Sequence, residues 1–230
     1  MHFAYDERAV TYLGRRDRRL RAVMERLGPL RREVIPDLFA ALVHAIVGQQ
    51  VSMTVQRTLW ERVQGALGEV SPARVLAVAP EDLRALGLSG RKVEYVREAA
   101  QAVAGGRLDM AALREMDDAA VCAALVSLRG VGLWTAEMLL LFSLQRQDVF
   151  SFDDLAIQRG LRMLYRHKLI DRARFERYRR RFSPYGSVAS LYLWAVAGGA
   201  LPELSDPAAE TRGRGGAEAR RRGGKKARPA

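Results

Sequence analysis

The chain has 230 residues, of which 49% are hydrophobic and 28% charged, and its formal net charge is +12 at pH 7. This length suffices for one large domain or two small lobes, and the composition is that of a soluble globular protein. A single cysteine excludes an internal disulfide, a four-cysteine iron–sulfur cluster and a cysteine-rich zinc site. The basic balance indicates a polyanionic partner, nucleic acid before a membrane.

Helical periodicity runs through most of the chain. Apolar residues at positions 39, 42, 43, 46 and 47 form one stripe of the kind that a helix buries. About ten helices joined by short loops are predicted, which makes an all-α protein. His44 lies in the first stripe and is interpreted as a packed core histidine. The clearest helices are expected after the Pro-Asp pair at 36–37, after Ser52, and over 117–128, 134–144, 155–165 and 185–196.

The C-terminal end of the chain differs in composition from the rest. Residues 205–230 contain eight basic and three acidic residues, so they carry +5 and leave +7 to the remainder. The segment has hardly any large apolar residue and cannot bury enough surface to offset its ordering entropy. We therefore predict a folded part over residues 1–204 and a disordered basic tail over 205–230.

Signals for targeting and for reactive thiol chemistry are weak. The opening residues are mixed and polar, unlike a signal peptide, and no apolar run reaches the roughly 18 residues of a membrane span. A cytoplasmic, nucleoid-associated protein without membrane contact is expected. Cys122 lies in an apolar helical stretch and is interpreted as a small buried hydrophobe.

A Gly-x-Gly turn, Gly130-Val131-Gly132, separates two of the predicted helices. Both glycines allow positive φ and close backbone approach. The next helix begins at the turn, so its free N–H groups and the positive end of its dipole suit a phosphate. A dinucleotide-binding loop is excluded, because the preceding segment has helical periodicity and Thr135 replaces the third glycine. A plain helical hairpin turn is the alternative interpretation. A looser hairpin of the same kind spans residues 86–92.

Two carboxylates, Asp153 and Asp154, follow the second helix of this hairpin. DNA-binding surfaces usually avoid carboxylates, because these repel the phosphate backbone. A carboxylate at this place therefore suggests chemistry on the nucleic acid rather than simple binding. The alternative is an N-cap for the helix from Leu155 onward, a role that either aspartate could fill.

Five segments together resemble a known superfamily, the helix-hairpin-helix (HhH-GPD) DNA glycosylases. Two are LRGVGLWTAEMLL from Leu128 and DVFSFDDLAIQRG from Asp148. The others are FAALVHAIVGQQVS from Phe39, GLSGRKVEYVREAA from Gly87 and PYGSVASLYLW from Pro184. They stand in the family's order and are most similar to the AlkA-like branch, DNA-3-methyladenine glycosylase II. The resemblance implies two helical lobes within residues 1–204, with a cleft between them and the hairpin at about 117–145. It leaves no room for the branch's N-terminal α/β domain before residue 36.

The resemblance also assigns the chemistry. It places the catalytic aspartate at Asp154, while Asp153 could be the helix cap. Cleavage of an N-glycosidic bond develops positive charge on the sugar, which a carboxylate stabilises. Lyase-competent relatives carry a lysine nucleophile at the position of Trp134. Trp134 has no amine, so hydrolysis without strand cleavage is implied. Packing in the core is the alternative for this tryptophan.

Further roles are carried over by position. A lesion-stabilising pocket is implied around Trp134, Met138 and Trp194, whereas Tyr185 and Tyr192 are assigned to packing. One departure is Gly186, which stands where the family commonly has an arginine, so that arginine's contact is missing or supplied elsewhere. The implied wedge that fills the gap left by a flipped base is Gln50, helped by Gln49. The implied phosphate contacts are Gly130, Gly132, Trp134, Thr135 and Lys92. A structural Na⁺ or K⁺ is implied at the backbone carbonyls of Val126, Leu128 and Val131.

The resulting hypothesis is a monomeric, monofunctional DNA glycosylase of base excision repair. It would flip alkylated bases, 3-methyladenine and 7-methylguanine, out of double-stranded DNA and hydrolyse their glycosidic bonds, leaving an abasic site. No cofactor is required for this chemistry. The alternatives are a glycosylase for another lesion, such as uracil or a mismatch, and a non-catalytic helix-hairpin-helix DNA-binding protein.

Overall fold

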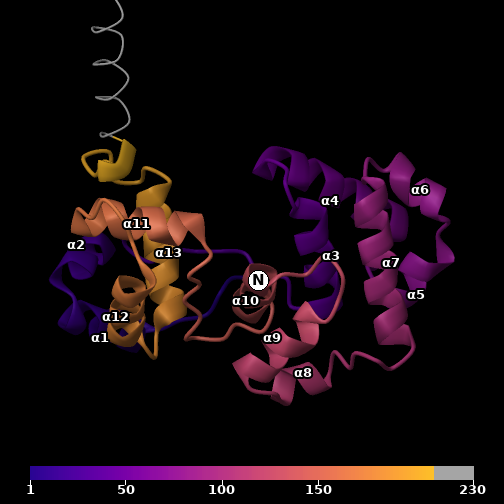
Figure 1. Ribbon diagram of the computed structural model, residues 1–230, viewed down its shortest axis with the longest axis horizontal. Coiled ribbons are helices and arrows are strands. Elements are labelled where there is room, and N and C mark those ends of the chain that lie inside the picture. The colour runs from indigo at the N-terminus through magenta and orange to yellow at the C-terminus, as the bar shows by residue number, and fades with distance from the viewer. Residues whose placement is uncertain (210–230) are drawn as a thin grey trace, which may run out of the picture. The chain divides into compact units, whose positions relative to one another are not determined.

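The computed structural model describes residues 1–209, which fold into α-helices without any β-strand (Figure 1). An isolated antiparallel bridge pairs His2 with Glu33. The all-α prediction is thereby confirmed, and the described residues contain no N-terminal α/β domain. The helices are α1 (Glu7–Arg16), α2 (Arg18–Leu27), α3 (Leu38–Gly48), α4 (Met53–Leu67), α5 (Pro72–Ala77), α6 (Pro80–Ala85), α7 (Gly90–Ala104), α8 (Ala112–Glu115), α9 (Asp118–Val126), α10 (Leu133–Phe142), α11 (Leu155–Tyr165), α12 (Arg172–Phe182) and α13 (Gly186–Ala197).

The chain divides into two compact units. Unit 1 consists of Met1–Ala4 and Arg31–Arg146, and it contains α3 to α10. Unit 2 consists of Tyr5–Leu30 and the described part of the chain from Gln147 onward. Its helices α1 and α2 pack against α11, α12 and α13, which lie more than a hundred residues later in the sequence.

The centre of unit 1 is α3, which packs against α4, α7 and α10. Because neighbours cover several of its sides, α3 buries more than the predicted stripe, and Leu38, Ala40 and Ala41 are buried as well. The predicted start signals are confirmed: Ser52 accepts a hydrogen bond from the amide of Val55 at the start of α4. At α9, Asp117 accepts one from the amide of Ala120.

In unit 2, α13 is buried along most of its length and packs closely on α11. The close approach depends on Gly160 of α11. A methyl group at this position would collide with the backbone carbonyl oxygen of Leu193 in α13. The glycine is therefore a requirement of helix packing rather than of backbone conformation.

Gly160→Ala is expected to destabilise the protein by about 1–3 kcal/mol, because backbone atoms must move to admit the new methyl group. Urea unfolding followed by circular dichroism measures the change. Gly65→Ala is the matched control, since Gly65 is exposed within α4 and nothing lies within 4 Å of a Cβ there. The control is expected to stabilise by about 0.5–1 kcal/mol. Equal effects of the two substitutions would contradict the packing role.

The predicted start of the tail at residue 205 is wrong. The carboxylate of Asp206 accepts hydrogen bonds from Arg162 of α11, at 3.0 Å from Nε and 2.6 Å from Nη2. This pair lowers the pKa of Asp206 and attaches the segment to the fold. Polar composition did not reveal the pair, because its partner lies 44 residues earlier. Residues 210–230 of the predicted tail lie outside the described residues.

Candidate active site

Asp154 is a buried carboxylate, 5% exposed, at the N-terminus of α11. Its Oδ1 accepts hydrogen bonds from the amides of Ala156 at 2.9 Å and Ile157 at 2.8 Å. It also accepts one from the indole Nε1 of Trp194, at 3.1 Å. These donors orient the carboxylate, and the positive end of the helix dipole stabilises its negative charge.

The structure corrects the assignment of the helix cap. Asp154 is the N-cap of α11, whereas the prediction that Asp153 caps this helix is wrong, since Asp153 is exposed one residue earlier. The two neighbouring aspartates satisfy the same sequence rule, so only the observed start of the helix at Leu155 decides between them. Asp154 is therefore both the helix cap and the residue to which the resemblance assigns the catalytic role. Capping explains the hydrogen bonds to the two amides but not the one from Trp194.

Trp194 lies within α13 and is half-buried. Its hydrogen bond to Asp154 links α13 to the N-terminus of α11, and the resemblance had placed it only in the base pocket. Tyr192, assigned to packing, is 1% exposed, and its hydroxyl donates to the carbonyl of Gly28 at 3.0 Å. That assignment is confirmed.

The hairpin of unit 1 joins α9 to α10 through a turn that contains Gly130 and Gly132. Gly130 has φ +79°, and a Cβ there would collide with the ring of Tyr95 on α7. Gly132 is the N-cap of α10 with φ −91°, so only Gly130 adopts the positive φ that both glycines allow. No side chain caps α10. This arrangement is that of a helix N-terminus suited to an anion.

The two hairpin residues assigned to the base pocket differ in exposure. Trp134, in the first turn of α10, is 44% exposed, which rules out the alternative of a core aromatic. Met138, one turn later, is buried at 9%. Thr135 beside them is also buried, at 5%. An exposed indole at a helix N-terminus fits a contact with a ligand better than it fits packing.

The loop after α3 contains both glutamines assigned to the wedge. Gln50 is exposed and has φ +57°, a left-handed conformation that is uncommon for a residue other than glycine and is often found at functional sites. Gln49 donates from Nε2 to the carbonyl oxygen of Gly130 at 2.7 Å, and this bond ties the loop to the hairpin. The Nζ of Lys92 donates to the carbonyl of Val47 at 2.8 Å. Lys92 thus holds the end of α3, and its contact with phosphate stays a prediction.

Gln50→Gly is expected to change stability by less than about 1 kcal/mol, because glycine adopts the left-handed conformation without strain. It is expected to slow base excision from duplex DNA about tenfold, since no side chain would fill the gap left by the flipped base. Excision from single-stranded DNA with the same lesion is the internal control, because no gap forms there. Equal slowing on both substrates would contradict the wedge role. Gln49→Ala separates the wedge from the tie to the hairpin.

One residue that the sequence did not single out is Asp148. Its Oδ1 accepts from the amide of Gly186 at 3.0 Å, and its Oδ2 accepts from the hydroxyl of Ser183 at 2.6 Å. Asp148 thereby serves α13, which has no local side-chain cap. A Cβ at Gly186 would lie 2.9 Å from Asp148 Oδ1. A larger residue at position 186 would therefore require this carboxylate to move.

Within the described residues, the histidines, the cysteine and the carboxylates do not form a metal site. In residues 1–209, no cluster of three or more His, Cys, Asp or Glu could hold a metal ion. Cys122 is only half-buried, less than expected, and burial together with Glu137 and Asp118 raises the pKa of its thiol to about 11. His44 packs edge-on against Trp60 at 5.0 Å and lies 3.3 Å from the Gln56 amide nitrogen, which confirms a packed histidine. No described helix is long and apolar enough to cross a bilayer.

Known proteins share both the sequence pattern and the fold. The model of the family described as HhH-GPD superfamily base excision DNA repair protein matches residues 43–184. DNA-3-methyladenine glycosylase 2 of Escherichia coli is 31% identical over 173 residues, which are 70% of this chain but 58% of that protein. The chain thus spans less than two thirds of this curated relative.

Two solved structures match most of both chains. The crystal structure of a DNA-3-methyladenine glycosidase from Bacillus halodurans has a TM-score of 0.77 and 35% identity, covering 89% of this chain and 95% of that one. The Schizosaccharomyces pombe 3-methyladenine DNA glycosylase Mag1, solved in complex with abasic DNA, has a TM-score of 0.75 and 26% identity. The match covers 83% of this chain and 97% of that one.

Proposed function

Because the chain belongs to the HhH-GPD superfamily of base excision DNA repair proteins, we propose that it is a DNA glycosylase that removes alkylated bases from duplex DNA. Asp154 carries the proposal. Capping of α11 accounts for two of the three donors to this buried carboxylate, whereas the bond from Trp194 fixes its orientation beyond what a cap requires, as a catalytic carboxylate needs. The relatives named DNA-3-methyladenine glycosylase support the substrate class.

The proposed reaction is hydrolysis of the bond between C1′ of the deoxyribose and the base nitrogen. As this bond breaks, its electron pair leaves with the base and positive charge develops on the sugar. The carboxylate of Asp154 stabilises that charge, and water adds to C1′. The added water loses its proton to solvent, and the products are the neutral free base and an abasic site.

The side chains also limit the reaction type. Trp134 offers no amine for a Schiff base, so water is the proposed nucleophile and the DNA strand stays intact. Purines alkylated at N3 or N7 carry positive charge and leave readily, so a single carboxylate suffices. The exposed indole face of Trp134 attracts such a cation more strongly than it attracts a normal base.

Two further features are proposed from the hairpin and from the family resemblance. A monovalent cation would be held by the carbonyls of Val126, Leu128 and Val131 and would stiffen the turn without taking part in catalysis. The Leu128 carbonyl accepts a bond from the Val131 amide in this turn at 3.2 Å, and the second lone pair that every carbonyl oxygen carries is the one proposed to face the ion. The protein is proposed to act on duplex DNA as a monomer.

A panel of single-lesion duplexes tests the function. Each duplex carries 3-methyladenine, 7-methylguanine, uracil or a mismatched base, and released base and strand cleavage are measured separately. Release of the alkylated purines, with cleavage only after alkali or heat, is the expected result. Release of uracil or a mismatched base alone would reassign the lesion. Tight binding without release from any duplex would indicate a non-catalytic DNA-binding protein.

A further inference from the structure

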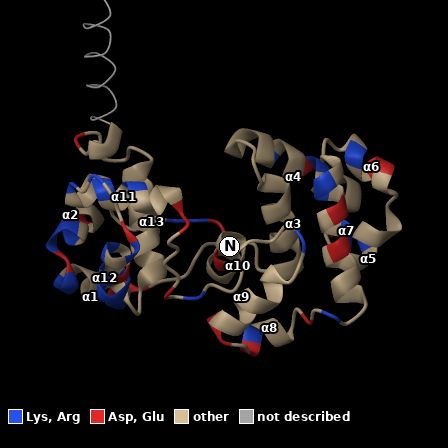
Figure 2. Ribbon diagram, viewed as in Figure 1, with Lys and Arg blue, Asp and Glu red and all other residues tan. Residues whose placement is uncertain are grey.

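Arginines are concentrated on α1, α2 and α12 of unit 2, outside the candidate active site (Figure 2). Helix α12 has the sequence RARFERYRRRF, in which six arginines accompany one glutamate. The junction of α1 and α2 reads Arg15-Arg16-Asp17-Arg18-Arg19. A hollow of about 460 Å³ opens here, and we name it the arginine pocket. It is lined by Arg16, Asp17, Arg18, Arg19, Tyr165 and Arg181.

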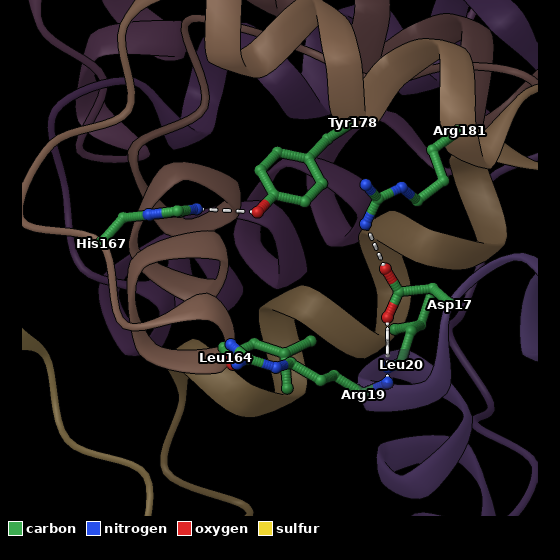
Figure 3. Close-up of polar contacts among 7 residues, drawn as sticks. All are labelled: Asp17, Arg19, Leu20, Leu164, His167, Tyr178 and Arg181. Carbon is green, nitrogen blue, oxygen red and sulfur yellow. Dashed lines mark hydrogen bonds and ion pairs between the residues drawn. The ribbon is translucent and has the colours of Figure 1, made fainter.

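The single carboxylate of the pocket, Asp17, makes structural hydrogen bonds within unit 2. It is 5% exposed, and its Oδ1 accepts from the amides of Arg19 at 3.0 Å and Leu20 at 2.9 Å, which caps α2. Its Oδ2 accepts from Nη1 of Arg181 on α12 at 2.7 Å (Figure 3). Four arginines against this one internal anion leave a net positive charge on the lining.

Aromatic rings hold the guanidinium groups in place. Arg19 Cζ lies 5.7 Å from the ring centre of Tyr165, and its Nη1 donates to the Leu164 carbonyl at 3.2 Å. Arg181 Cζ lies 5.3 Å from the ring of Tyr178. Arg16 Cζ lies 5.3 Å from the ring of Tyr12, and Arg16 Nη2 donates to the Tyr12 hydroxyl at 3.0 Å. Stacked guanidinium groups lose less side-chain entropy when they bind an anion than freely moving ones do.

Further arginines near the pocket add to its positive charge. Besides burial, Arg174, Arg19 and Arg177 lower the pKa of His167, whose Nε2 lies 2.8 Å from the Tyr178 hydroxyl. Glu176, the acidic residue within α12, forms an ion pair with Arg172, in which Glu176 Oε1 lies 3.2 Å from Arg172 Nε. The surroundings therefore add positive potential to the pocket and little negative charge that could compete with a ligand.

We propose that the arginine pocket binds phosphates of the DNA backbone and forms a second DNA-binding surface, on unit 2, in addition to the hairpin of unit 1. The planar guanidinium fork matches two phosphate oxygens at once. A lining of four arginines, one aspartate and one tyrosine lacks the apolar centre that protein interfaces usually have, which favours nucleic acid over an acidic protein. Backbone contacts hold DNA without regard to sequence. The inference rests on the proposed function in one respect, that DNA is the polyanion taken as the ligand. The positive charge of the pocket is observed independently of that function.

The double substitution Arg16→Gln/Arg18→Gln tests the surface while keeping the buried pair of Asp17 and Arg181. Binding of an undamaged 30-base-pair duplex is measured by fluorescence anisotropy at several salt concentrations, so the readout needs no catalysis. Each phosphate contact contributes about 0.9 to the slope of log Kd against log salt. The double variant is expected to lose about 1–2 units of slope and to bind about tenfold more weakly near physiological salt.

The matched control is Arg8→Gln/Arg21→Gln, which removes the same charge from α1 and α2 at residues outside the pocket lining. It is expected to keep most of the slope. Arg18→Lys keeps the charge and is expected to restore about one contact relative to Arg18→Gln. Equal slopes for the pocket and control variants would overturn the proposal. So would a pocket-dependent affinity for polyglutamate together with an unchanged affinity for DNA, which would point to an acidic protein partner.

Failure of this proposal is distinguishable from failure of the proposed function. If the protein releases no base from any lesion, undamaged duplex can still bind with a pocket-dependent slope. If the pocket variants bind undamaged duplex like the control, base release from the lesion panel can still proceed. Thermal unfolding of each variant, followed by circular dichroism, identifies any change that acts through the fold.

Discussion

Asp154→Asn is expected to reduce the rate of base excision by about 10²–10³-fold, the loss typical of removing one group that stabilises transition-state charge. The substitution removes the negative charge of the side chain while keeping its role as a helix cap. Asparagine is as good an N-cap as aspartate, so its side-chain oxygen can still accept from the amides of Ala156 and Ile157. Single-turnover release of 7-methylguanine from methylated duplex DNA is the measurement.

Two variants complete this test. Asp154→Ala loses both the charge and the cap, so it should be as inactive as the asparagine variant and also less stable by about 1 kcal/mol. Asp153→Asn changes an exposed neighbour that makes no cap and should retain activity. If Asp154 served only as a cap, the asparagine variant would excise bases at the wild-type rate, and the catalytic assignment would be lost.

Gly130→Ala is expected to destabilise the protein by about 2–4 kcal/mol, through two separate effects. The left-handed conformation at φ +79° costs an alanine about 1 kcal/mol. Its methyl group also collides with the ring of Tyr95, and overpacking of this kind costs about 1–3 kcal/mol. Urea unfolding measures the sum, and the affinity for undamaged duplex should fall because the turn must shift.

The neighbouring glycine supplies a matched control in the same turn. Gly132 has φ −91° and nothing within 4 Å of a Cβ, so Gly132→Ala should change stability by less than about 0.5 kcal/mol. Combining Gly130→Ala with Tyr95→Ala removes the collision but not the backbone strain. The double-mutant cycle should therefore show a coupling of about 1–3 kcal/mol between the two positions. Additive effects would show that Tyr95 does not constrain the turn.

Several parts of the fold follow from local sequence alone. The apolar period from Phe39, the caps Ser52 and Asp117 and the turn at Gly130 were predictable because each depends on residues within one or two turns of helix. Asp154 was found because its block follows the hairpin at the family's spacing. In these places local propensity and tertiary structure agree.

The remaining features depend on residues that are distant in sequence. The bond from Gln49 to Gly130 spans 81 positions, and the ion pair of Asp17 with Arg181 spans 164. Neither pair has a local signature, because a glutamine or an arginine on a polar surface has many equivalent partners in sequence. The assignment of the cap to Asp153 failed for a different reason, since a shift of one residue in the start of a helix exchanges the roles of two identical side chains.

Unit 2 is built from two separate segments of the chain, and this affects how the protein can fold while it is synthesised on the ribosome. Helices α1 and α2 emerge first, but the helices against which they pack are made only after the whole of unit 1. Leu13 and Leu20, which are buried in the folded unit, are therefore made before these later helices and can be exposed to chaperones or to other chains. Unit 1 is almost continuous and can bury its core in the meantime. Chains truncated after residue 146 and released from the ribosome should thus resist proteolysis within unit 1 while remaining sensitive within residues 5–30.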